Sequence, residues 1–275
     1  MNAAMAIAAQ EWRGSVRNRW LVGSVVLMLA SAVALALVGE APGGRTGVGG
    51  GGMLIVSLAT LGIYFVPLIG LLLGHDAVIA EAERGTLALT LSCPLSRDAF
   101  LIGKAASHAG VLLLATVSGV GAAAGVVALT GGFGSGPGPG ALIGLAASTF
   151  VLGLVFLLIG YAISARVRER ATAVGLAVAV WLGFVILYDL AVIGVLVATE
   201  GALPGFVVRL LLLANPADVY RLFNLAAVGG MELAEAVAGA GMHAGLGRAD
   251  LVAAGIVWLG VAALLARASF ARREL

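Results

Sequence analysis

The stretch ALIGLAASTFVLGLVFLLIGYAISA, residues 141–165, decides the fold class because it runs for 25 residues without a charged side chain. About 20 apolar residues are enough to cross the hydrocarbon core of a bilayer as a helix. The whole chain agrees, since 61% of its 275 residues are hydrophobic, 11% are charged and the mean hydropathy is +1.10. Soluble domains carry about 25% charged residues. The sequence therefore predicts an all-α integral membrane protein and excludes a water-soluble enzyme.

Similar windows on both sides of this stretch bring the expected number of transmembrane helices to six. The last window is only 16 residues long, but Arg267 can extend its side chain to the membrane surface and Phe270 prolongs the apolar stretch. Asp250 precedes this window, where a carboxylate favours the start of a helix. The further windows are residues 20–38, 53–74, 105–130, 171–199 and 251–266.

The distribution of basic residues predicts the orientation of these six spans. Cytoplasmic loops of membrane proteins carry an excess of Lys and Arg. Twelve of the 16 basic residues fall before the first span, between spans 2 and 3, between spans 4 and 5, or after span 6. Both termini are therefore expected in the cytoplasm. The twelve are Arg13, Arg17, Arg19, Arg84, Arg97, Lys104, Arg166, Arg168, Arg170, Arg267, Arg272 and Arg273.

The chain is expected to form one transmembrane domain over residues 1–275, with an amphipathic helix at its N-terminus. Within residues 1–19 and at Trp20, apolar side chains recur at intervals of three or four, as on one face of a helix. Such a helix would lie in the membrane interface. Residues 75–104 form a long cytoplasmic segment and residues 200–250 a periplasmic loop.

Pairs of glycines four residues apart predict that some of the helices pack closely. Small residues at this spacing let two helix backbones approach each other in a membrane. The pattern occurs at Gly70/Gly74, Gly121/Gly125 and Gly140/Gly144. It does not identify which helices are in contact, because the chain contains 41 glycines.

No catalytic, nucleotide-binding or metal-binding constellation is recognisable in this sequence. The only lysine, Lys104, lies in a Gly-Lys-Ala context and position 98, where a P-loop would begin with glycine, is Asp. The protease motif His-Glu-x-x-His is absent. Met231, Met242 and His243 offer soft and imidazole ligands, but ligand preference alone is weak support for a copper contact. The net charge of +2 argues against nucleic acid as a partner.

Two polar positions toward the outer side each allow two interpretations. Asp189 lies within the fifth span, where a carboxylate either lines a transport path or makes a structural contact with a neighbouring helix. In the last outer loop, Asn215-Pro216 favours a turn, and Asp218 and Arg221 can pair at a spacing of three. That region is either an internal brace or a docking surface for a periplasmic partner.

The densest polar pattern is the cytoplasmic segment between the second and third spans, residues 75–104. Its acidic residues Asp76, Glu81 and Glu83 are followed by Gly85, which permits a turn. Pro94 ends any preceding helix, and Ser96 can cap a new one that continues into the third span. A 30-residue segment of this kind is longer than a connector requires. It is expected to dock another protein.

Residues 81–104, EAERGTLALTLSCPLSRDAFLIGK, resemble the second inner segment of ABC-2-type transporter permeases. In that family Glu-x-Gly-Thr-Leu and Pro-Leu-Ser-Arg recur before a helix that ends in Gly-Lys. RNRWL at 17–21, YDL at 188–190 and NPADVYRLFNL at 215–225 extend the resemblance over nearly the whole chain. Cys93 departs from the pattern, because an aromatic residue is more usual at its position.

The resemblance implies a homodimeric permease in the bacterial inner membrane, driven by a separate subunit that binds ATP and Mg. A periplasmic protein would bind the outer loop. Within the family, the similarity to permeases that serve nitrous oxide reductase implies a role in assembling a copper site, with a copper chaperone as a further partner. The transported species would be copper or a sulfur-containing compound. In a purely mechanical role, nothing would cross the membrane. A stand-alone channel or a carrier that uses Asp189 is the alternative.

The residues expected to act in such a permease fall into two groups. The first would couple the chain to the ATPase through charge-assisted contacts of the acidic pair and Arg97, with glycine and proline shaping the turns. It comprises Glu81, Glu83, Gly85, Thr86, Pro94 and Arg97. The second would contact the periplasmic partner and comprises Asn215, Pro216, Asp218, Tyr220 and Arg221.

Overall fold

The computed structural model describes residues 50–92, 96–130, 138–200, 202–237 and 246–273, together with the helical positions 26, 30, 33 and 34. The described residues are helical, without a β-strand. The interfacial helix at 1–19, most of the first span, Cys93, Pro94, Met242 and His243 lie outside the described residues. The elements are α3 (Gly50–Gly74), α4 (Ile79–Glu83), α5 (Thr86–Ser92), α6 (Arg97–Thr130), α7 (Pro139–Arg166), α8 (Arg170–Leu182), the π-helix η1 (Gly183–Leu187), α9 (Tyr188–Ala198), α10 (Gly205–Leu213), α11 (Pro216–Val237) and α12 (Arg248–Ala271).

Five stretches of helix in the described part of the chain are long and apolar enough to cross a membrane: 54–83, 97–126, 139–166, 170–198 and 248–271. They correspond to the second through sixth expected spans. The last one is 24 residues long rather than 16, because α12 begins at Arg248 and continues past Arg267. At 1.5 Å per residue, 24 residues are sufficient for a bilayer core of about 30 Å.

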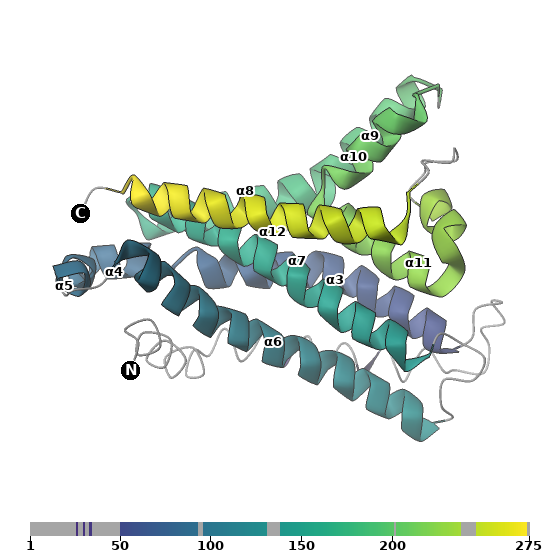
Figure 1. Ribbon diagram of the computed structural model, residues 1–275, viewed down its shortest axis with the longest axis horizontal. Coiled ribbons are helices and arrows are strands. Elements are labelled where there is room, and N and C mark those ends of the chain that lie inside the picture. Colours follow the sequence, from purple (N-terminus) through teal and green to yellow (C-terminus); the bar gives the residue numbers. More distant parts are fainter. Residues whose placement is uncertain are drawn as a thin grey trace.

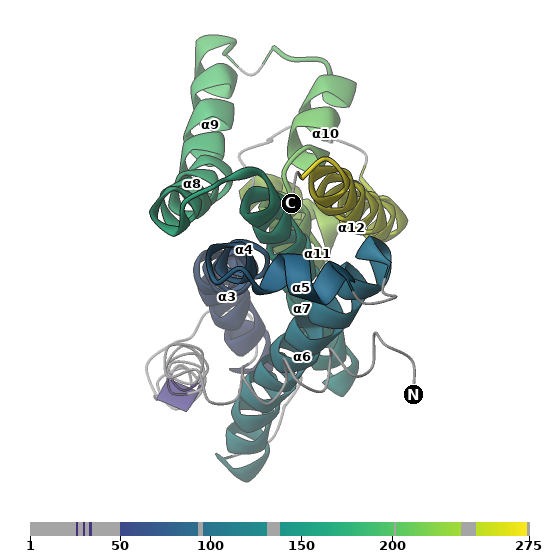
Figure 2. The same ribbon diagram turned by 90° about the vertical axis from the view of Figure 1, so that its left-hand side faces the viewer.

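Helix α7 occupies the centre of the bundle (Figures 1 and 2) and contacts α3, α6, α8, α11 and α12. It is apolar all round, as expected of a helix that crosses a membrane or lies in a core. Phe156, Leu157 and Tyr161 of α7 are fully buried. They join two apolar clusters, one with α3 and the other with α6 and α12.

Helices α3 and α7 cross closely, and of the three glycine pairs it is Gly70/Gly74 that lies at this crossing. A Cβ atom placed on Gly70 would lie 2.7 Å from the carbonyl oxygen of Gly153, and one placed on Gly74 would collide with the backbone of Leu157 and Gly160. Only glycine permits backbones to approach this closely. Gly121 and Gly125, by contrast, have no neighbour within 4 Å of an added Cβ.

The fifth span is interrupted by the π-helix η1, which separates α8 from α9. Beyond this point α9 diverges from the bundle and α10 leads the chain back toward it (Figure 2), while α11 packs along α3, α7 and α12. The region expected to be a periplasmic loop, 200–250, therefore contains two helices. One of them packs into the bundle. The hydropathy pattern did not predict these helices, because α10 is too short and α11 too polar to be recognised as a transmembrane span.

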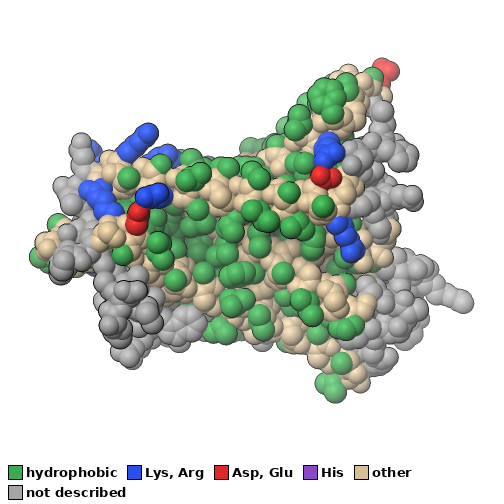
Figure 3. Space-filling model, viewed as in Figure 1, with side chains coloured by type: hydrophobic (Ala, Val, Ile, Leu, Met, Phe, Trp, Pro, Cys, Tyr) green, Lys and Arg blue, Asp and Glu red, His purple; other side chains and the backbone are tan. Residues whose placement is uncertain are grey.

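The ends of the helices that were expected to face the cytoplasm lie together in space. Arg267 of α12 pairs with Asp98 of α6, with nitrogen–oxygen distances of 2.8 and 3.0 Å. Arg273 donates a 2.8 Å hydrogen bond to the carbonyl of Ser164 at the end of α7. Figure 3 shows Lys and Arg side chains gathered at this end of the molecule. We call it the inner end; that it faces the cytoplasm remains a prediction from charge.

Candidate functional site

Helices α4 and α5 form a short helical hairpin at the inner end (Figure 1). The turn between them depends on Gly85, whose φ of +70° lies in the left-handed region that favours glycine. Residues 83–86 are exposed, whereas Leu87 is buried and anchors α5. The hairpin therefore offers an exposed turn on a fixed base. We call residues 79–92 the inner hairpin.

Helix α7 holds the beginning of the inner hairpin through Ser164. The backbone N–H groups of Val78 and Ile79 both donate 3.0 Å hydrogen bonds to the Ser164 hydroxyl, which is fully buried. The first N–H groups of a helix have no partner within it. Ser164 satisfies two of these groups at the start of α4 and so fixes the hairpin to the central helix.

Helix α6 holds the inner hairpin through a buried ion pair. The Lys104 ammonium lies 2.6 Å from a Glu81 carboxylate oxygen, and their side chains are 5% and 17% exposed. The same ammonium lies 5.5 Å from the centre of the Phe100 ring. Glu81, expected to contact an ATPase directly, is thus engaged within its own chain. The sequence analysis used Lys104 for the orientation of the spans and excluded it as a P-loop lysine, but it did not identify the ion pair with Glu81.

Glu83 joins the exposed turn to the start of α8. One of its carboxylate oxygens accepts a 3.0 Å hydrogen bond from the backbone N–H of Arg170. The Arg170 guanidinium in turn pairs with Asp76 just before the hairpin. A carboxylate at a helix N-terminus is stabilised by the partial positive charge there. Glu83 nevertheless remains exposed, next to Gly85 and Thr86.

Arg97 is partly exposed, and its guanidinium contacts the end of α12. Its guanidinium donates hydrogen bonds of 3.0, 3.1 and 3.0 Å to the carbonyls of Phe270, Ala271 and Arg273. The last carbonyls of a helix lack partners within it, and a cation there is favourable. All three bonds start from one guanidinium nitrogen, Nη1, and they cap the end of α12.

A second polar cluster lies between the middle and the outer end of the bundle, where the start of α9 meets α11. Arg221 of α11 pairs with Asp189 of the fifth span, and its guanidinium lies 3.3 Å from a carboxylate oxygen of Asp218. Burial raises the pKa of Asp218 to about 7, although Arg221 opposes this shift. The expected pairing of positions 218 and 221 is present. We call Asp189, Asn215, Asp218 and Arg221 the outer cluster.

Asn215 connects the outer cluster to the π-helix. Its amide nitrogen donates a 2.9 Å hydrogen bond to the carbonyl of Phe184 in η1, and its side-chain oxygen accepts one of 3.0 Å from the N–H of Ala217. The same side chain therefore caps α11 and contacts the irregular turn of the fifth span. A π-helical turn within an α-helix is uncommon and is frequently found at functional sites.

The remainder of the 215–225 motif binds α11 to the central helix. The Tyr220 hydroxyl lies 3.1 Å from the Thr149 hydroxyl, and the Asn224 amide donates a 3.0 Å hydrogen bond to the Ser148 hydroxyl. Burial raises the pKa of the Tyr220 hydroxyl above its ordinary value. These contacts are those of an internal brace between α7, α9 and α11.

A family model for ABC-2 family transporter proteins matches residues 5–275. This chain belongs to the ABC-2 transporter family. It is 39% identical over 274 residues to a probable ABC transporter permease protein NosY from Stutzerimonas stutzeri, covering 99% of each chain. It is 37% identical over 278 residues to the protein of the same name from Pseudomonas aeruginosa, covering 100% of each.

In this ABC-2 permease, the structure brings four of the predicted coupling residues together in the inner hairpin: Glu81, Glu83, Gly85 and Thr86. Arg97 lies apart from them, at the end of α12. The sequence did not identify Ser164 and Arg170, which contribute to the base of the hairpin. Their partners are more than 80 residues away in the chain, so no local pattern could point to them.

The residues predicted to contact a periplasmic partner lie side by side at the outer end, but four of the five are buried within the chain. Asn215, Pro216, Asp218 and Tyr220 are covered, and only Arg221 is partly exposed. Buried side chains cannot form a contact surface without a rearrangement of α11. Among the described residues, no group of three or more His, Cys, Asp or Glu side chains could hold a metal ion.

Proposed function

We propose that this permease couples to a separate, NosF-like ATP-binding subunit through the inner hairpin. The observation that carries the proposal is an exposed turn, residues 83–86, on a base tied to three different spans. Ser164 ties it to α7, Lys104 to α6 and Arg170 to α8. A push on this turn would reach all three helices, because packed helices move as rigid elements.

The partner subunit would bind ATP with Mg and hydrolyse the ATP, and this chain would supply no catalytic group. The lack of a P-loop in its sequence supports this division of labour. The other partners that the family resemblance implies are a second copy of this chain, a periplasmic NosD-like protein and the surrounding bilayer of the bacterial inner membrane. The relatives named NosY support the further proposal that the transporter serves assembly of the copper site of nitrous oxide reductase.

The alternative, a stand-alone carrier that uses Asp189 as a proton site, is not favoured. A carboxylate that binds and releases protons must spend part of its cycle without a fixed cation. Asp189 is paired with Arg221, which supplies it with a fixed cation. This ion pair between two helices supports the structural one of the two interpretations drawn from the sequence.

Reversing the charge of Glu83 tests the coupling proposal. Glu83→Lys places a cation in the exposed turn and at the N-terminus of α8, so we expect weaker copurification of the ATP-binding subunit with normal membrane insertion. The matched control is Glu169→Lys, which changes the same charge at the exposed N-cap of α8, where the carboxylate makes no capping hydrogen bond. Equal retention of the ATPase by both variants would contradict the proposal.

Deletion of the gene tests the assignment to nitrous oxide reductase separately. We expect the reductase to be made and exported but to lack its catalytic copper site. A fully metallated, active reductase in the deletion strain would refute this assignment and leave the coupling proposal untouched.

A further inference from the structure

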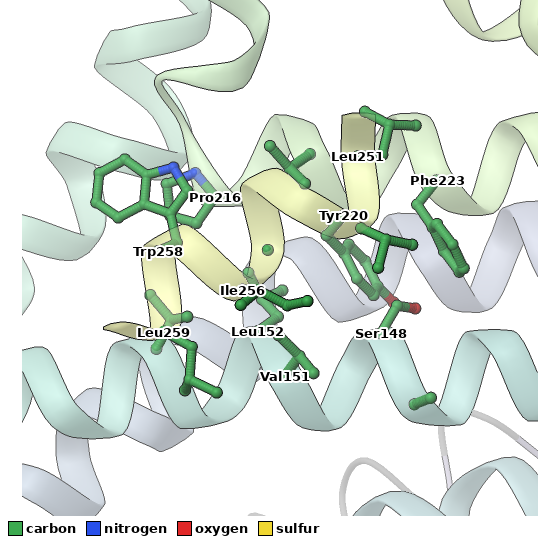
Figure 4. A pocket seen from close by; sticks show the side chains of 15 residues that line it. Ser148, Val151, Leu152, Pro216, Tyr220, Phe223, Leu251, Ile256, Trp258 and Leu259 are labelled. Atoms are coloured by element: carbon green, nitrogen blue, oxygen red, sulfur yellow. The ribbon is translucent and has the colours of Figure 1, made fainter. Parts of the chain in front are cut away.

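A cavity of about 220 Å³ lies between α7, α11 and α12 toward the outer half of the bundle. Figure 4 shows side chains from all three helices pointing into it, among them Val151, Tyr220, Phe223, Ile256 and Trp258. It is independent of the inner hairpin and of the ion pairs of the outer cluster. Nothing in the proposed function uses it.

The lining of this cavity favours an apolar occupant over water. Its two hydroxyl groups are already engaged, that of Ser148 with Asn224 and that of Tyr220 with Thr149. The rest of the lining is hydrocarbon and the indole of Trp258, whose N–H donates a 3.0 Å hydrogen bond to the carbonyl of Leu213. An ordered water needs two to four polar partners, and apolar cavities instead stay dry or bind apolar molecules.

The cavity borders the face of the molecule that a bilayer would cover. Val252 and Ile256 belong to its lining and are nevertheless 49% and 66% exposed. They continue an exposed apolar face along α12 through Val257, Val261 and Leu264. Because α7 and α12 are both membrane-spanning, the medium at this rim is lipid hydrocarbon, and an acyl chain is the apolar group available to enter.

A cation lies one helical turn beyond the lining, where a lipid headgroup would be. Arg248 is exposed and precedes the lining residue Leu251 by three positions on α12. One hydrogen bond of 3.0 Å joins its guanidinium to the carbonyl of Ala226, and a guanidinium carries five N–H donors. Arg209 pairs with Asp250, two residues further along α12, at 2.6 Å. Arginine binds phosphate oxygens through two parallel hydrogen bonds where the geometry allows.

We propose that this cavity binds one acyl chain of a membrane phospholipid whose phosphate is held by Arg248. The hydrophobic lining supplies affinity and the arginine fixes the depth of the lipid. The bound chain fills the space between α11 and α12, so it supports the packing of the brace helix against the bundle. This site is separate from the proposed ATPase coupling, and neither depends on the other.

Photo-crosslinking tests the site in the full-length chain. The protein is reconstituted in vesicles of phosphatidylethanolamine and phosphatidylglycerol that contain a phosphatidylglycerol with a diazirine on one acyl chain. After irradiation, we expect lipid adducts on peptides that contain Val151 or Ile256. Gly255→Leu should reduce these adducts to background, because an added Cβ at Gly255 lies 3.9 Å from Val151 and a larger side chain enters the cavity.

The matched control for filling the cavity is Gly260→Leu on the same helix. A Cβ at Gly260 has no neighbour within 4 Å, so this variant adds the same side chain outside the cavity and should retain the adducts. Equal labelling of the two leucine variants would overturn the proposal. So would a crosslink from these peptides to a second copy of the chain in place of lipid, because the face would then be a subunit interface.

Arg248→Glu tests the headgroup contact without altering the cavity. Loss of a charge-assisted contact is expected to lower labelling by the phosphatidylglycerol probe roughly tenfold. Labelling by a diazirine fatty alcohol, which has no phosphate, should be unchanged. Arg267→Glu at the inner end serves as the control for net charge. If Arg248→Glu and Arg267→Glu label alike with both probes, the phosphate is not held by Arg248.

Discussion

The inner hairpin and the outer cluster are both built from short charged motifs, yet their charges have different partners. At the inner end, Glu83 and Arg97 contact the ends of helices α8 and α12. At the outer end, Arg221 contacts two carboxylates, Asp189 and Asp218. The first arrangement leaves a turn exposed for another protein. The second holds three helices together from within.

This difference has energetic consequences. An exposed charge at a helix terminus contributes about 0.3–1 kcal/mol and can be lost at small cost. Removing one member of a buried ion pair costs about 3–5 kcal/mol, because the remaining charge has no partner. The outer cluster and the buried Glu81–Lys104 pair are therefore expected to determine whether the permease folds, and the exposed turn of the inner hairpin whether it couples.

The most disruptive test of this comparison is Arg221→Glu. It would place three carboxylates within one cluster, two of them in or beside a membrane span, so we expect a loss of about 3 kcal/mol or more of stability. The measurement is the amount of folded permease in membranes and its thermal unfolding in detergent. Loss of the permease itself would support the brace.

Arg221→Lys is the control, since it keeps the cation near Asp189 and Asp218 and should accumulate close to the normal level. A contrary result for Arg221→Glu would be normal insertion and stability with loss of a periplasmic partner. That result would support the interpretation of residues 215–225 as a docking surface.

The second test concerns the one buried ion pair of the inner hairpin. Lys104→Met leaves the Glu81 carboxylate buried without its cation, and we expect about 3 kcal/mol of destabilisation together with weaker ATPase retention. The double variant Glu81→Leu/Lys104→Met replaces the pair with apolar side chains and should regain most of the stability. If the effects of the two single variants simply add in the double variant, the two side chains do not act as a pair.

Several features of the fold were predictable from the sequence because they depend on neighbours in the chain. The hydroxyl of Ser96 accepts a 3.1 Å hydrogen bond from the N–H of Ala99 and caps α6, as its position before the helix indicated. Asp250 accepts a 2.8 Å hydrogen bond from the N–H of Gly247 at the start of α12. Apolar length identified the second through sixth spans. Each of these signals lies within one helix.

The contacts that the sequence did not reveal join residues far apart. Asn215 donates a hydrogen bond to Phe184 of η1, 31 residues away, and the pair of Asp189 with Arg221 spans 32 residues. Hydropathy also cannot place α11, because a helix with polar and apolar faces can lie on the membrane surface or enter the bundle. Tyr220 and Asn224 find hydroxyl partners on α7, and these partners make burial of α11 favourable.

The smallest expected effect is that of Gly85→Ala in the exposed turn of the inner hairpin. Gly85 has a φ of +70° and no atom within 4 Å of an added Cβ, so Gly85→Ala introduces backbone strain without a collision. We expect about 1 kcal/mol of destabilisation, with a weaker association of the ATPase because the turn would shift to relieve the strain. Gly121→Ala is the matched control: it also adds a methyl group to open space, but within α6, where alanine is favoured over glycine. Thermal unfolding temperature and ATPase copurification should therefore decrease in Gly85→Ala and should not decrease in Gly121→Ala. Identical behaviour of the two variants would show that the shape of the turn does not matter for coupling.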